Sequence, residues 1–289
     1  MLIFQSVSQN YLKPFFIIFI TIFSVLRTRF FKLIVWVLIA CALHLIPPMI
    51  YAAQVTLAWD ASEGPVTGYQ MHYGTTSGDY DYIVNIGNYT SCSISGLKEG
   101  ATYYFAVTAY SDIAGESDFS DEISYTLYED AQDGGQNGWR IYDDSPIGAN
   151  IKNTYDNDRQ GQVIQLSGSG TGNGYRLNND SFAKWQNSNQ FIIRWSMKYS
   201  EYFKVYIDIE TTDGHRYLYY TPTDYDGLGN GEYVQFGIGS DANDGKWHTY
   251  TRDLQADLED AKPNSQIIEV NGFLIRGSGK LDDIILLDQ

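Results

Sequence analysis

The sequence predicts an all-β protein, with two β-sandwich domains in tandem after an N-terminal signal segment. Apolar and polar residues alternate with period two in short segments from position 54 onward, as in half-buried strands. The 27 Gly and frequent Asp-Gly and Asn-Gly pairs supply tight turns between such strands. Only Cys92 lies beyond position 53, so the exported part has no internal disulfide and depends on packed cores.

Acidic residues dominate the chain once the leader is set aside. Residues 1–53 hold four of the 19 basic residues and none of the 35 acidic ones, so the remainder carries a net charge near −20. Nucleic acids and anionic lipid surfaces bind through clustered Lys and Arg. The composition therefore excludes nucleic-acid binding.

Residues 1–53 have the character of a targeting leader. Two apolar runs, 15–26 and 33–46, flank a basic patch, and small residues follow at Ala52 and Ala53. This order predicts a signal peptide cleaved near these two alanines, with export to the periplasm, the cell surface or the medium. Two alternatives stay open: a lipid anchor on Cys41, and a retained membrane anchor formed by both runs.

The first exported segment carries three motifs in the order of a known family. They are Val-Thr-Leu-Ala-Trp-Asp at 55–60, Thr-Gly-Tyr-Gln-Met-His-Tyr-Gly at 67–74, and Ile-Ser-Gly-Leu at the start of 94–110. Residues 54–127 resemble a fibronectin type III domain. The resemblance implies that Trp59 fills the core and that Tyr103 forms a tyrosine corner.

The fibronectin-like segment is short at its beginning. The family's first strand has little or no sequence to form it, which is typical of bacterial versions of the domain. An uncovered sheet edge is prone to pair with other chains. We therefore expect this edge to be protected by the second domain or by a protein partner.

Residues 128–289 predict a second β-sandwich, of jelly-roll type. The turn Asp244-Gly245 is one of several that separate the strands, and one short helix is expected at 254–261, before Pro263. The expected strands are 163–166, 191–199, 203–210, 216–220, 233–238, 247–252, 272–276 and 282–287.

The two ends of this second segment resemble carbohydrate-binding modules with a galactose-binding-like jelly roll. The resemblance rests on 128–130 with 138–139 at the start, 279–286 at the end, and Asp-Gly-Lys-Trp-His-Thr-Tyr at 244–250. It implies a structural calcium ion between the first and last strands, with Glu129, Asp282 and Asp283 as hard oxygen ligands. The alternative is a solvated turn in which the two aspartates only begin a strand.

Sugar binding requires flat aromatic faces together with polar groups for the hydroxyls. Strand alternation predicts an outward row of such side chains, and Trp185 lies in a polar segment where it would be exposed for stacking. An ordinary solvated sheet face is the alternative. The predicted carbohydrate-binding residues are Trp185, Arg194, Tyr206, Asp208, Tyr217, Tyr219 and Arg276.

No catalytic motif stands out in the sequence. Only His215 and His248 offer histidine bases in the second domain, and neither belongs to a recognisable acid-base pattern. We therefore expect an exported, non-catalytic binding or adhesion protein that binds a polysaccharide or cell-surface glycan. The alternatives are a structural or protein-interacting surface component and, less favoured, a β-sandwich polysaccharide lyase or hydrolase.

Overall fold

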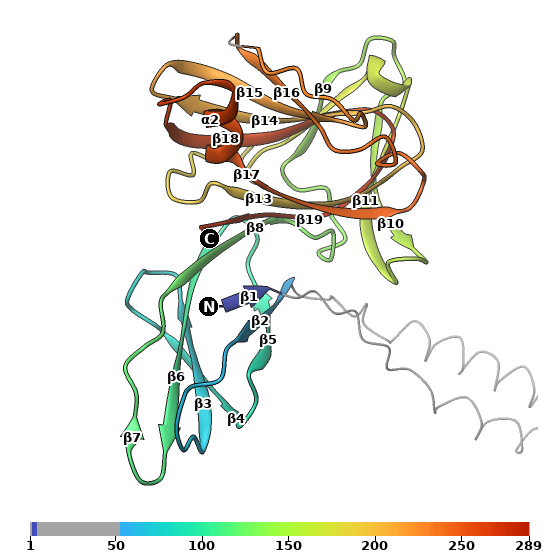
Figure 1. The fold of residues 1–289 in the computed structure, drawn as a ribbon. Coiled ribbons are helices and arrows are strands. Elements are labelled where there is room, and N and C mark those ends of the chain that lie inside the picture. The colour runs from blue at the N-terminus through green and yellow to red at the C-terminus, as the bar shows by residue number, and fades with distance from the viewer. Residues whose placement is uncertain (1, 5–52, 230, 289) are drawn as a thin grey trace, which may run out of the picture. The chain divides into compact units, whose positions relative to one another are not determined.

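The computed structural model describes residues 2–4, 53–229 and 231–288 (Figure 1). They are almost entirely β-structure, so the predicted all-β class with two sandwiches is confirmed. Among these residues, no helix is long and apolar enough to cross a membrane. Apart from residues 2–4 and Ala53, the predicted leader, including Cys41, lies outside the described residues, and the signal peptide stays a prediction.

The first sandwich consists of a three-stranded and a four-stranded layer. The smaller sheet has the order β1-β2-β5, and the larger layer has the order β4-β3-β6-β8 with β7 beside β6. The strands are β1 (Leu2–Phe4), β2 (Ala53–Trp59), β3 (Gly68–Gly74), β4 (Tyr82–Gly87), β5 (Ser91–Leu97), β6 (Thr102–Ser111), β7 (Gly115–Glu116) and β8 (Ile123–Glu129).

The core of this sandwich contains the residues that the family resemblance implies. Trp59 is buried and meets the ring of Tyr69 edge to face, with 5.7 Å between centroids. The backbone N–H of Lys98 donates to the Tyr103 hydroxyl at 3.2 Å, which ties the loop before β6 to that strand. Both structural predictions, a core tryptophan and a tyrosine corner, are confirmed.

The edge of β2 that the sequence leaves without a first strand is covered in the structure. β1 pairs antiparallel with β2, with Leu2 opposite Trp59 and Phe4 opposite Leu57. In the structure the covering strand comes from the segment that the sequence assigns to the leader. An extended segment of any origin satisfies the free backbone groups of an edge.

The second sandwich packs a six-stranded sheet against a layer formed by β10, β11, β19, β13 and β17 (Figure 1). The six-stranded sheet has the order β16-β15-β14-β18-β12-β9. Its strands are β9 (Trp139–Asp143), β12 (Gly174–Leu177), β14 (Lys204–Thr211), β15 (Gly214–Thr221), β16 (Tyr233–Gly237) and β18 (Ile267–Arg276). The opposite layer has β10 (Asn150–Asp156), β11 (Gly161–Ser167), β13 (Ile192–Tyr199), β17 (Trp247–Asp253) and β19 (Gly279–Leu287).

Helix α2 (Leu254–Ala261) lies where the sequence predicts a helix. The Asp253 side chain accepts a hydrogen bond from the backbone N–H of Ala256, which caps the first turn. A 3₁₀ turn, η1 (Gly170–Gly172), precedes β12. Three strands, β9, β10 and β12, are additions to those predicted from the sequence.

Strand β8 belongs to both sandwiches. It pairs with β6 on one side and with β19 on the other, where Leu127 stands opposite Ile285 and Tyr125 opposite Leu287. Ile285 and Leu287 pack in the core of the first sandwich, although they lie in the last strand of the second. One ten-stranded sheet therefore runs through both sandwiches, and no linker separates them.

Candidate functional site

The six-stranded sheet has one face on the core and one face directed away from it, which we call the outer face. Val205, Ile207 and Leu218 belong to the core, so the alternate residues on β14 and β15 point outward. The outward residues include Tyr206 on β14 and Tyr217 and Tyr219 on β15, as the sequence predicts. β16 adds Tyr233, which is 52% exposed and stands opposite Tyr217.

Tyr206, Tyr217, Tyr219 and Tyr233 form a tyrosine cluster on this face. The rings of Tyr206 and Tyr219 stack at 5.3 Å between centroids, and those of Tyr217 and Tyr233 stack at 5.2 Å. Tyr206 also meets Tyr217 edge to face at 6.0 Å. Burial raises the pKa of Tyr206 to about 12, so its hydroxyl stays protonated and can donate a hydrogen bond. The cluster presents the rigid, amphipathic rings that sugar recognition requires.

A charged network adjoins the tyrosine cluster. An Arg176 guanidinium N–H donates to Asp208 Oδ2 at 2.8 Å, and His215 Nε2 lies 3.0 Å from Asp208 Oδ1. The other His215 ring nitrogen lies 3.1 Å from Glu232 Oε1. Both ring nitrogens of His215 therefore face carboxyl groups. His215 thereby connects the tyrosine cluster to the acidic segment before β16.

Arg276 and Tyr142 form a second aromatic and cationic group on the outer face. The Arg276 guanidinium lies 5.5 Å from the centre of the Tyr142 ring and forms an ion pair with Asp143. The Tyr142 ring lies directly over Gly174, where a Cβ atom would come within 2.4 Å of it. Only glycine at position 174 leaves room for this ring.

Three of the predicted carbohydrate-binding residues need correction. Trp185 is buried and not exposed: it is 9% exposed and stacks on Tyr128 at 3.7 Å between centroids. Arg194 lies on β13, in the layer opposite the outer face, because its strand pairs with β17 and β19. Asp208 points to the outer face but is 2% exposed, since Arg176 and His215 cover both of its oxygens.

The structure adds outer-face residues that the sequence reasoning missed: Arg140, Tyr142, Arg176, His215 and Tyr233. Arg140, Tyr142 and Arg176 lie on β9 and β12, two strands that are too short to show a clear alternation. Tyr233 begins a strand that was predicted, and its alternation with the buried Val234 is the signal that could have found it.

The residues predicted to bind calcium lie at the junction of the two sandwiches, among other carboxylates. Burial, and next the charge of Glu99, raise the pKa of Glu129 well above its usual range. Burial, and next the charge of Asp283, do the same for Asp282. Asp283 also has a left-handed backbone, with φ of 50°, which is uncommon for a residue other than glycine. Burial and the neighbouring carboxylates thus both disfavour the charged forms of Glu129 and Asp282.

These carboxylates suit calcium in their chemistry but not in their arrangement. Both Glu129 oxygens accept hydrogen bonds at 2.6 Å, from the backbone N–H of Ala131 and from the Trp139 indole. Arg159 forms ion pairs with both Asp282 and Asp283. Within the described ranges, no group of three His, Cys, Asp or Glu side chains is placed to hold a metal ion. A guanidinium occupies the position between the two aspartates that a cation would take.

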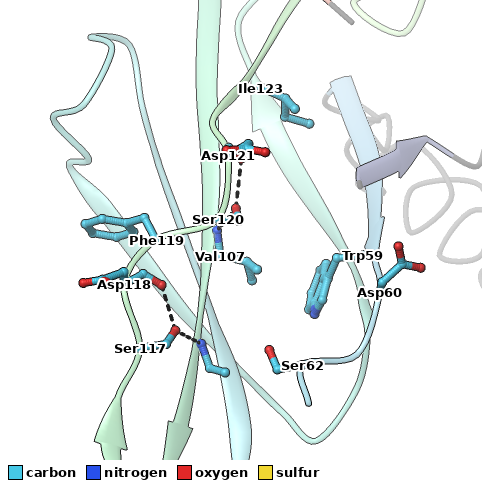
Figure 2. Close-up of a pocket in the computed structure, with 11 residues that line it drawn as sticks. Trp59, Asp60, Ser62, Val107, Ser117, Asp118, Phe119, Ser120, Asp121 and Ile123 are labelled. Carbon is cyan, nitrogen blue, oxygen red and sulfur yellow. Dashed lines mark hydrogen bonds between the residues drawn. The ribbon is translucent and has the colours of Figure 1, made fainter.

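A separate cavity of about 210 Å³ lies in the first sandwich (Figure 2). Trp59, Val107 and Ile123 line it together with the segment 117–121. The two serine hydroxyls of the segment 117–121 accept hydrogen bonds from β6: Ser117 accepts from the Ala109 N–H and Ser120 from the Val107 N–H, both at 3.0 Å. These two hydroxyls of the cavity wall are therefore already hydrogen-bonded to β6. The outer face is the stronger candidate site.

One part of the chain matches a known protein family. Residues 50–126 match the fibronectin type III domain family. The chain is 42% identical over 76 residues to a Kelch domain-containing protein of Saccharolobus solfataricus and 35% identical over 74 residues to contactin-3 of Rattus norvegicus. The two alignments take in 24% and 25% of this chain, and 10% and 7% of those proteins.

The solved structures that align with this chain include a carbohydrate-binding module. A family 11 module from a cellulosomal cellulase of Clostridium thermocellum aligns with 56% of this chain and 93% of its own length, at 14% identity and a TM-score of 0.33. The chain carries a fibronectin type III domain at residues 50–126, and a second β-sandwich follows it.

Proposed function

We propose that the jelly-roll domain binds a polysaccharide on its outer face, and that the protein is an exported, non-catalytic binding or adhesion protein. The tyrosine cluster with its adjoining charged network is the observation that carries this proposal. Stacked rings offer flat apolar surface to a sugar ring, while Arg176, Arg276 and the tyrosine hydroxyls offer donors to its hydroxyls. The fibronectin type III domain, fused through β8, acts as the supporting unit.

Binding of the full chain to a glycan array, followed by titration calorimetry with the best polymer, tests the proposal. Tyr206→Ala should lower the affinity about tenfold, because it removes a central ring of the cluster. Tyr155→Ala is the matched control: Tyr155 is 56% exposed but lies on β10, in the opposite layer, and its loss should leave affinity unchanged.

Two outcomes would contradict the proposed function. Failure to bind any polysaccharide would leave the structural or protein-interacting component as the better account. New reducing ends or unsaturated products after incubation with the polymers would show a hydrolase or lyase, for which His215 between Asp208 and Glu232 would be the first residue to test.

A structural calcium at Glu129, Asp282 and Asp283 stays a proposal, with Arg159 as its competitor. If calcium binds there, it has to share or replace the guanidinium at the two aspartates. Calcium should therefore raise the melting temperature of Arg159→Gln more than that of the unmodified protein, by several degrees at saturating calcium. Scanning calorimetry in calcium and in chelator measures this difference. No calcium effect in either protein would remove the metal from the proposal.

A further inference from the structure

The outer face has two pairs of basic side chains, and the two members of each pair stand directly opposite each other on neighbouring strands. Arg140 on β9 is the cross-strand partner of Arg176 on β12, and Lys204 on β14 is the partner of Arg276 on β18. Their strand neighbours Trp139, Val205 and Ile275 are in the core, so these side chains share the outward direction. Like charges directly opposite each other in a sheet are destabilising unless something lies between them.

In each pair, one side chain forms an ion pair with a carboxylate and the other does not. Arg176 pairs with Asp208, and Arg276 pairs with Asp143. Arg140 and Lys204 have no hydrogen bond or ion pair with any residue that the structure describes. In a chain of net charge −16, carboxylates are abundant, and none of the described ones serves these two cations. The outer face thus holds two basic groups available to an anionic ligand.

The free cations flank the tyrosine cluster. One cross-strand row reads Tyr219, Tyr206, Leu274, Arg176 and Arg140, from β15 to β9. With strands about 4.8 Å apart, Arg140 lies roughly 14 Å across the sheet from Tyr206. Lys204 lies two residues before Tyr206 on β14, on the same face. A chain of sugar rings that crosses the strands over Tyr206 would meet a basic group beside the rings and another at the far end.

We propose that the glycan bound on the outer face is acidic, a polyuronate whose carboxylates contact Arg140 and Lys204 while its rings lie on the tyrosine cluster. This inference rests on the proposed polysaccharide binding and names its ligand class. A guanidinium matches a carboxylate with two parallel hydrogen bonds, which suits Arg140 to a uronate group. The net negative charge of the molecule opposes a polyanion at long range, but physiological salt screens that repulsion beyond about 8 Å. The affinity for a polyuronate then depends on the nearby Arg140 and Lys204.

Titration of the full chain with polygalacturonate, its methyl ester and a neutral β-glucan tests the inference. The ester keeps the sugar chain and removes its charge. We expect at least tenfold tighter binding to the acid form than to the ester, weakened as salt is raised from 50 to 300 mM. Alginate and its ester repeat the comparison on a second uronate backbone. A preference for the acid form of either polymer supports the inference.

Two variants test whether the preference for the acid form depends on Arg140 and Lys204. Arg140→Gln and Lys204→Gln should each reduce the difference between acid and ester several-fold and weaken the salt dependence. Lys152→Gln is the matched control, because Lys152 is exposed on β10 in the opposite layer. The melting temperature should not fall in Arg140→Gln, since it relieves the repulsion from Arg176. A fall in binding without a fall in melting temperature separates ligand contact from damage to the fold.

The failures of the two proposals are distinguishable. Equal binding of the acid and ester forms, or binding to neutral polymers alone, would overturn the acidic ligand and leave polysaccharide binding in place. Unchanged acid preference in both variants would overturn the assignment to Arg140 and Lys204. No binding to any polymer would overturn the proposed function itself.

Discussion

At the scale of single residues, Glu99 couples the first sandwich to the carboxylates of the junction. Glu99 lies in the loop before β6 and accepts a hydrogen bond from the backbone N–H of Asp130 at 3.2 Å. Burial, and next the charge of Asp130, raise the pKa of Glu99 to about 8. A carboxyl group with a raised pKa holds its proton more tightly in the folded state than in the unfolded state.

The stability of the protein should therefore fall as pH rises from about 4.5 to about 8, the window between the ordinary and the raised pKa of Glu99. Below this window the proton is bound in both states and the stabilisation is complete; above it, the folded state has to accommodate the charge. Melting temperatures in chelator between pH 5 and pH 8.5 measure the slope. Glu99→Gln should flatten it, while the exposed Glu63→Gln should not. Equal slopes in both variants would refute the role of Glu99.

The limits of sequence reasoning are clearest for Trp185 and Asp208. The polar residues around Trp185 predict exposure, but Asn187 and Gln190 turn toward β8: Asn187 donates to the Tyr128 hydroxyl at 3.3 Å and Gln190 to the Ser124 hydroxyl at 2.9 Å. Alternation gives the direction of Asp208 correctly but carries no information about Arg176, which covers it from a strand that is distant in sequence.

At the scale of elements, the segment 185–190 packs against one face of β8 and forms hydrogen bonds to it. Gln190 is fully buried, and its side-chain oxygen accepts a hydrogen bond from the Thr126 hydroxyl at 2.5 Å. Trp185 stacks on Tyr128, two residues further along β8. Ser124, Thr126 and Tyr128 are alternate residues, so the segment contacts a single face of the strand. A polar segment of the second sandwich thereby completes the burial of a strand of the first.

Gln190→Ala should cost about 2 to 3 kcal/mol of unfolding free energy, because it removes the amide partner of the buried Ser124 hydroxyl and one of the two partners of the Thr126 hydroxyl. Urea denaturation followed by tryptophan fluorescence measures this loss. The exposed neighbour Asn189→Ala is the control and should change stability by less than about 0.5 kcal/mol. A similar small effect for both variants would mean that the segment does not fasten β8.

Most elements could be predicted because their signals are local. The end of the helix at 254–261 follows from the proline just after it, and the long strands follow from alternation. β9 and β12 were missed because strands of four or five residues show little periodicity. The role of Gly174 was also missed, because it depends on the contact with the Tyr142 ring, which lies on another strand. The tyrosine cluster was predicted in part, since neighbouring strands of a hairpin bring Tyr206 and Tyr219 together. Arg140 and Arg176 required the register between non-neighbouring strands.

At the scale of the whole molecule, the shared strand makes two sandwiches depend on each other. Ile284 packs in the core of the second sandwich, and the next residue, Ile285, packs in the core of the first. Adjacent residues of β19 thus pack in two different cores. Domains joined by a flexible linker unfold independently, whereas a continuous sheet transmits disruption from one core to the other.

We expect calorimetry to show a single unfolding transition. Ile284→Ala and Ile285→Ala should each lower its midpoint, with a loss of about 2 to 5 kcal/mol for a truncated core side chain, although they face different cores. Hydrogen exchange on β3 and β14 provides an independent probe for each sandwich. Two transitions, each shifted by only one of the variants, would contradict a shared sheet.

The position of β19 also bears on the order in which the chain can mature. A ribosome delivers the fibronectin type III segment first, but Ile285 and Leu287, which belong to its core, emerge more than 150 residues after β8. Until then the free edge of β8 is open to other extended chains. The earliest domain to appear is therefore among the last to be finished, and a chaperone that shields β8 during delivery would protect the molecule at its most vulnerable stage.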